Sequence, residues 1–182
     1  MNTAATEPDP PAASVVEPQP DAPMVTGPET ISAADASAAA QALERVRELI
    51  GQSQWNQLPQ ATQAASEMKL SAEQKRDADA YRDLARLAVD YRAAIVRAAA
   101  KLKEEDELAV TEEFLVRVVE SGDQHLVVRY AGKQKRLTPD EFPFPLAHKL
   151  AGTELPASPS TEAAKAVYQA IAPRSNEGYR NQ

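Results

Sequence analysis

Cysteine is absent from the 182 residues, and glycine and aromatic residues are scarce, with six glycines and an aromatic share of 5%. Without cysteine the chain cannot form a disulfide framework, a thiolate zinc site or a thiol nucleophile. No apolar run approaches the roughly 20 residues that span a bilayer. The first residues also lack the basic start and apolar block of a signal peptide. We therefore expect a chain that is soluble as written and has no transmembrane segment.

Acidic residues exceed basic ones by seven, and the excess is unevenly spread. Residues 1–32 hold five acidic residues and no Lys or Arg, whereas the remainder holds 22 acidic and 20 basic residues. The same N-terminal segment contains seven of the 14 prolines. Such a composition cannot bury enough apolar surface to offset chain entropy. We expect residues 1–31 to be a disordered, Pro/Ala-rich acidic tether, and the near-neutral remainder argues against general nucleic-acid binding.

Residues 32–104 are expected to form a helical region. Ser32 and Asp35 have capping-box spacing before an alanine-rich helix that ends at Gly51, and a shorter helix with Trp55 as a core anchor follows. A second capping box at Ser71 opens the longest helix, because no Gly or Pro occurs before Gly122. Its apolar residues recur at alternating spacings of three and four, which predicts one buried face: Tyr81, Leu84, Ala88, Tyr91, Ile95, Ala98 and Leu102.

Residues 105–182 are expected to form a small β-meander with C-terminal helices, because at Glu107 the apolar period changes from helical to alternating. The segments "EFLVRVVES", "QHLVVRY" and "KRL" are candidate strands, and two-residue type II′ loops at 122–123 and 132–133 would join them into a meander. This pairing sets Val118 opposite Val127 and Val128 opposite Leu137. It also predicts apolar side chains on both faces of the sheet, one of them packed on the long helix and the other closed as in a small SH3-like barrel.

Short helices are expected to follow the strands up to residue 182. "TPDE" at 138–141 is typical of a helix start, with Thr138 as the N-cap and Glu141 closing a capping box. The last helix has a predicted apolar stripe of Ala163, Val167, Ala170 and Ile171. The fold class is therefore α+β, with a helical hairpin and one long helix packed on a small antiparallel sheet that C-terminal helices close. The end at "SNEGYRNQ" stops where another helix could begin, as in a fragment or a truncated gene product.

Basic residues gather on the predicted sheet and form the candidate anion-binding set: Arg117, Arg129, Lys133, Lys135 and Arg136. The expected register sets Arg129 opposite Arg136, and facing like charges destabilise a ladder unless an anion lies between them. That anion is either a carboxylate of this chain, such as Glu113 or Asp140, or a ligand or partner. Only Tyr130 could stack on a base, which further argues against nucleic acid.

No catalytic, metal-binding or cofactor-binding pattern is present. His125 and His148 fall in a strand and in a later helix, with no further metal ligands spaced around them. Asp140 and Glu141 are adjacent, but capping a helix accounts for them. We therefore expect a protein that is not an enzyme and that needs no cofactor.

Four segments carry a resemblance: "AKLKEEDEL", "VRVVESGDQHLVVRYAGKQKRL", "EFPFPLAHKLAG" and "AAKAVYQAIAP". In this order, over residues 92–180, they resemble a group of uncharacterised planctomycete bacterial proteins that combine a Pro/Ala-rich linker, helices and a short β segment with an LVVR-x-AG-basic pattern. The resemblance implies no activity. Its members often begin with a secretory or lipoprotein signal, so the expected compartment is the envelope or periplasm if an upstream signal is missing, and otherwise the cytoplasm.

These patterns favour a non-enzymatic protein-interaction or scaffolding module, with the envelope as one place for it and a partner of unknown identity. The alternative is an anion-binding or nucleic-acid-binding module that uses the basic hairpin.

Overall fold

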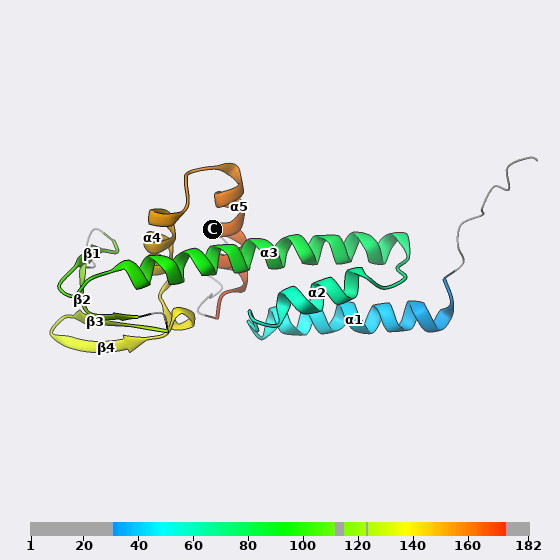
Figure 1. Cartoon of the computed structure of the whole chain (residues 1–182), viewed down its shortest axis with the longest axis horizontal. Coiled ribbons are helices and arrows are strands. Elements are labelled where there is room, and N and C mark those ends of the chain that lie inside the picture. Colours follow the sequence, from blue (N-terminus) through cyan, green and yellow to red (C-terminus); the bar gives the residue numbers. More distant parts are fainter. Residues whose placement is uncertain (1–30, 112–114, 123, 174–182) are drawn as a thin grey trace, which may run out of the picture. The chain divides into compact units, whose positions relative to one another are not determined.

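A computed structural model describes residues 31–111, 115–122 and 124–173 (Figure 1). The expected tether therefore lies outside the described residues, except for Ile31. The described residues form one compact unit. The described chain forms five α-helices, one 3-10 turn and a four-stranded antiparallel sheet, which confirms the α+β class. The elements are α1 (Ala33–Gly51), α2 (Leu58–Ser66), α3 (Ala72–Lys101), β1 (Glu107–Ala109), β2 (Leu115–Gly122), β3 (His125–Tyr130), β4 (Lys133–Leu137), η1 (Pro139–Glu141), α4 (Phe144–Glu154) and α5 (Pro159–Ile171).

Local capping fixes the helix starts where the sequence predicts them. The Ser32 hydroxyl accepts a hydrogen bond from the Asp35 backbone N–H at 3.1 Å. Ser71 and Gln74 form a complete capping box at the start of α3, with bonds of 3.2 Å and 3.0 Å in the two directions. Satisfying the free N–H groups of the first turn lets helices begin at defined residues.

Helix α3 spans 30 residues and contacts both the N-terminal helices and the sheet with its C-terminal helices (Figure 1). Its N-terminal part packs beside α1 and α2, and its C-terminal part contacts β2, α4 and α5. Tyr91 and Ile95, central in the predicted buried face, are 1% and 0% exposed. Trp55 is also buried, as expected for a core anchor, and stacks on Tyr168 with ring centroids 5.8 Å apart.

The sheet has the order β1-β2-β3-β4, so it is a meander with β1 and β4 at its edges. The first strand, β1, was not among the predicted strands. One face is buried against α3 and α4 and holds Val116, Val118, Leu126, Val128 and Leu137. The outer face also carries apolar side chains, as expected, among them Val127, which pairs with Arg136, and Leu115, which is 50% exposed.

Both hairpin loops differ from the type II′ loops expected at the glycines. The β3–β4 loop is Ala131–Gly132, with φ of 46° and 75°, and positive φ at both positions is what a type I′ turn requires. Val128 consequently pairs with Lys135 rather than Leu137, and Arg129 pairs with Gln134 rather than Arg136. The β2–β3 loop begins after Gly122, and an irregularity around Val119 shifts the register so that Val118 pairs with Val128 instead of Val127.

The C-terminal helices close the core. Glu141 accepts hydrogen bonds from the Thr138 backbone N–H and hydroxyl, both at 2.9 Å, as the capping-box spacing predicts. The predicted stripe of α5 is only partly right, because Ala163 and Ala170 are exposed while Ala164 and Tyr168 are buried. The face of α5 that carries Ala164 and Tyr168 is buried because the Tyr168 ring stacks on Trp55 and packs against Tyr91.

Candidate functional site

The five predicted anion-binding residues do not form one cluster. Strand residues alternate between faces, and paired residues share a face. Arg129 pairs with both Arg117 and Gln134, and Arg136 pairs with Val127, which places all three arginines on the outer face. Lys133 and Lys135 pair with Tyr130 and Val128, which places both lysines on the face that carries the core. The set therefore divides into three outer arginines and two inner lysines.

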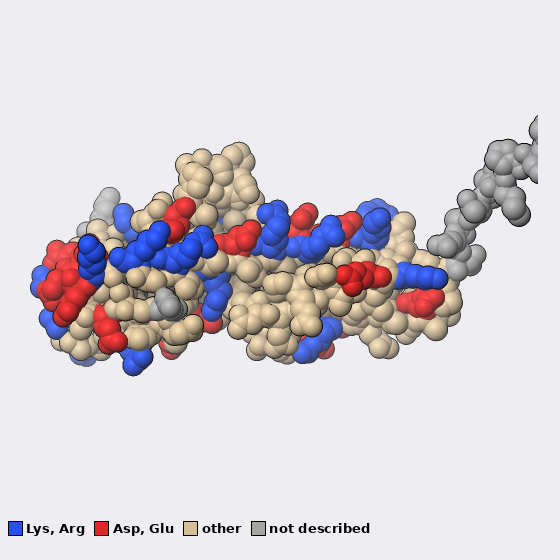
Figure 2. Space-filling view, in the orientation of Figure 1, with Lys and Arg blue, Asp and Glu red and all other residues tan. Residues whose placement is uncertain are grey.

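Arg117 already has carboxylate partners. Its guanidinium lies 2.6 Å from Glu107 and 3.1 Å from Glu105, and these bonds, with Glu107 first, raise the pKa of Arg117. Both glutamates lie around β1, at the end of the sheet where acidic side chains gather in Figure 2. An exposed pair of this kind is worth at most about 1 kcal/mol, so it orients the Arg117 side chain without removing its charge.

Arg129 and Arg136 have no ion pair within 4.0 Å among the described residues, although Arg136 contributes to lowering the pKa of Glu120 behind the larger effect of His125. Asp140, one of the proposed internal partners, is bound to Arg92 instead, at 2.8 Å. Glu113, the other, lies outside the described residues. Arg117 and Arg129 thus face each other, and of these two only Arg117 is paired with described carboxylates.

The inner lysines lie at a cavity of about 450 Å³ beneath the β3–β4 hairpin. Apolar side chains make most of its wall: Val116, Val128, Leu137, Pro143 and Leu146. Tyr130, Ala131, Lys133 and Lys135 line it on the hairpin side. Neither lysine forms an ion pair with a described residue. The cavity combines a mostly apolar wall with two cationic groups, which is the composition of sites that orient a ligand by a few polar contacts.

The local fold explains why this cavity forms. The inner face of the hairpin is less covered near the Ala131–Gly132 loop than at its other end. Near the other end of the hairpin, Leu126 pairs with Leu137 and both are buried, whereas Tyr130 near the loop is 48% exposed. Pro143 and Leu146 at the start of α4 supply the opposite wall. The apolar surface near the loop is therefore only partly covered.

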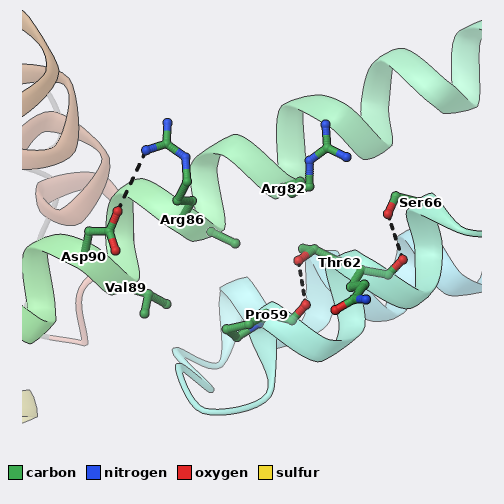
Figure 3. A pocket seen from close by; sticks show the side chains of 9 residues that line it. Pro59, Thr62, Ser66, Arg82, Arg86, Val89 and Asp90 are labelled. Atoms are coloured by element: carbon green, nitrogen blue, oxygen red, sulfur yellow. Dashed lines mark hydrogen bonds and ion pairs between the residues drawn. The ribbon is translucent and has the colours of Figure 1, made fainter.

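A second cavity of about 430 Å³ lies between α2 and α3 (Figure 3). Pro59, Thr62 and Ser66 line it from α2, and Arg82, Arg86 and Asp90 line it from α3. The charges here are already matched within α3, because Arg82 lies 2.8 Å from Asp79 and Arg86 lies 3.8 Å from Asp90. Figure 2 shows the same mixture of signs along α3. The arginines of this cavity are therefore less available to a charged ligand than the lysines at the cavity under the hairpin.

The two histidines are engaged separately. His125 Nε2 lies 2.8 Å from Glu120, and His148 Nδ1 lies 3.1 Å from the Tyr91 hydroxyl. Burial and then Lys165 lower the pKa of His148. Across residues 31–111, 115–122 and 124–173, no group of three or more His, Cys, Asp or Glu side chains could hold a metal ion. Nothing in these contacts arranges a nucleophile beside a base.

No helix within the described part of the chain is both long and apolar enough to cross a membrane.

The cavity was not predicted from the sequence. The sequence patterns single out Lys133 and Lys135 for anion binding and Tyr130 for base stacking, and they indicate Val128 and Leu137 only as apolar residues of the sheet. The signal that could have found the site is the alternation in "VVRYAGKQKRL", which puts Val128, Lys133 and Lys135 on one face once the loop is set at Ala131–Gly132.

Searches of protein-family models, curated proteins and solved structures find no match to this chain.

Proposed function

We propose that the chain is a non-enzymatic interaction module that binds an acidic, partly apolar segment of a partner protein at the cavity under the β3–β4 hairpin. The observation that carries this proposal is the pair Lys133 and Lys135, which line an apolar cavity and have no described acidic partner. An apolar side chain in the cavity would bury surface, and acidic side chains beside it would meet the two lysines.

A display library of roughly eight-residue peptides, selected on the full chain, tests the proposal. Selected peptides should contain acidic residues beside a large apolar one. Their Kd, measured by calorimetry at about 150 mM salt, should rise at least tenfold in the double variant Lys133→Gln, Lys135→Gln. Selection that yields no such peptides, or peptides indifferent to this change, would contradict the proposal.

The matched control changes two lysines away from the cavity. Lys69 lies between α2 and α3, and Lys103 follows α3, and both are exposed. The double variant Lys69→Gln, Lys103→Gln removes the same charge from the chain, so its peptide affinity should stay within about twofold of the wild type. Equal losses in both variants would mean that net charge, and not the cavity, drives binding.

A second candidate function is an anion-binding module on the outer face of the sheet. The specific observation in its favour is that Arg129 faces Arg117 and has no ion pair among the described residues. Heparin and single-stranded DNA carry negative charge but no peptide side chain that could fill the apolar cavity. Their binding would therefore distinguish the anion-binding function from the peptide-binding one. Micromolar, salt-sensitive binding of either polyanion, lost on changing Arg129 and Arg136 to Gln but retained on changing the two inner lysines, would favour this candidate.

A further inference from the structure

Strand β4 lies at an edge of the sheet, with β3 on one side and no further described strand on the other. Residues 133–136 are all exposed. An edge strand of this kind presents a row of unpaired backbone groups on which another strand can form. The free edge is next to the cavity, because two of its residues, Lys133 and Lys135, line that cavity.

The register identifies which backbone groups face outwards. In a hairpin closed by a two-residue loop, the residues that flank the loop form a hydrogen-bonded pair, and bonded and non-bonded pairs then alternate. Tyr130 and Lys133 flank the loop Ala131–Gly132. Gln134 and Arg136 therefore belong to non-bonded pairs, and their N–H and C=O groups point away from β3. No described residue forms a hydrogen bond with these groups from outside the sheet.

The side chains of β4 set the chemistry of an added strand. On the inner face, such a strand would lie beside Lys133, Lys135 and the apolar cavity. On the outer face it would lie beside Gln134 and Arg136. Opposite charges on neighbouring strands are favourable and like charges are not. A second copy of β4 would bring lysine against lysine, so the edge disfavours self-association and favours an acidic strand.

We infer that the partner segment proposed above binds as a fifth strand along β4, with its backbone paired to Gln134 and Arg136. The side chains on its inner face are an apolar residue that lies over the cavity and acidic residues that lie beside Lys133 and Lys135. Main-chain hydrogen bonds supply affinity in this mode, and the pocket for alternate side chains supplies specificity. This inference rests on the proposed function and adds how the partner is bound.

Amide hydrogen exchange measured by NMR tests the pairing directly. The probe is the tightest acidic peptide from the library selection, added at saturation to the full chain. The backbone amides of Gln134 and Arg136 should exchange at least about tenfold more slowly with the peptide bound. Lys135 is the internal reference, since its amide already faces β3 and its protection should change less. Unchanged exchange at both outward amides would overturn the inference.

N-methylation of the peptide provides the second arm. Each peptide amide is methylated singly, which removes one donor and leaves every side chain in place. Affinity should fall at least tenfold at alternate positions and stay within about threefold at the positions between them. A flat profile would overturn strand addition. If the profile were flat but affinity still depended on the two lysines, the proposed function would stand and only the strand-addition mode would fail. If no peptide bound at all, both the proposed function and the strand-addition mode would be contradicted.

Discussion

Arg92 and Asp140 are joined by two hydrogen bonds, from Arg92 Nε to one carboxylate oxygen at 2.8 Å and from Nη2 to the other at 3.2 Å. The residues are 48 positions apart in the sequence, and the pair ties α3 to the η1 turn between β4 and α4. Arg92 is 24% exposed and Asp140 is 41% exposed at the side chain, so solvent screens the pair only partly. This contact positions the start of α4, which forms one wall of the cavity.

Asp140→Asn should lower the free energy of unfolding by about 1 kcal/mol, because it removes the charge from a bidentate pair in a partly solvated place. Urea unfolding measures the change. Asp90→Asn is the matched control, since Asp90 lies 3.8 Å from Arg86 and both side chains are well exposed. The control should change stability by less than about 0.5 kcal/mol. Equal effects in the two variants would show that the Arg92 contact contributes nothing specific.

Ile95→Ala should lower the free energy of unfolding by about 2–4 kcal/mol, because the side chain is fully buried and its loss leaves a cavity. Ile95→Val removes one methylene and should cost about 0.5–1.5 kcal/mol. Denaturant unfolding of both variants measures the two losses of unfolding free energy. A loss below about 0.5 kcal/mol for Ile95→Ala would contradict the packing of α3 against the sheet and α4.

Alkaline pH should destabilise the fold through Tyr168. Burial, and then Asp140, raises the pKa of its phenol to about 12, against a usual value of 10. A group whose pKa is higher in the folded state gives its full stabilisation below its unfolded pKa and loses it as pH rises towards the folded value. Stability should therefore be lost between about pH 10 and pH 12, at up to about 1.4 kcal/mol per pH unit for this group.

Tyr168→Phe should make that decline shallower, because the variant has no phenol to ionise at this position. Urea midpoints at about pH 9 and pH 11 measure the slope. Burial also raises the pKa of Tyr91, so a decline from Tyr91 should remain. Equal slopes in the wild type and in Tyr168→Phe would contradict the role of Tyr168.

Local signals in the sequence predicted the helical part of the fold well. Capping at Ser32 and Ser71 depends on residues three positions apart, and the buried face of α3 follows from spacings of three and four. The hairpin register was wrong because the type I′ loop puts Ala131 at a φ of 46°, which alanine disfavours, whereas a glycine-first loop at Gly132 looked more favourable. A shift in the loop changes every pair that follows.

Long-range contacts account for the rest of what the sequence did not reveal. Which face of α5 is buried depends on Tyr168 stacking on Trp55. Asp140 forms its hydrogen bonds with Arg92 rather than with an arginine of the hairpin. The cavity itself requires Leu146 of α4 and Val128 of β3 to line the same space. None of these pairs is near in sequence, and periodicity carries no information about which distant element supplies a partner.

The facing arginines on the outer sheet give the last prediction. Arg129 lies directly opposite Arg117, and like charges in facing positions destabilise a ladder. Glu105 and Glu107 offset part of this repulsion, so Arg129→Thr should raise the Tm by only about 1 °C in low salt, and added salt should shrink the difference because it screens the repulsion. Thermal unfolding followed by circular dichroism measures both effects.

Gln134→Thr separates charge from strand propensity, since Gln134 pairs with Arg129 on the same face and carries no charge. Any gain that threonine brings by favouring β structure appears in both variants. The salt-dependent gain should appear only in Arg129→Thr. A lower Tm for Arg129→Thr would contradict the repulsion and would mean that a carboxylate of this chain holds Arg129 in the wild type.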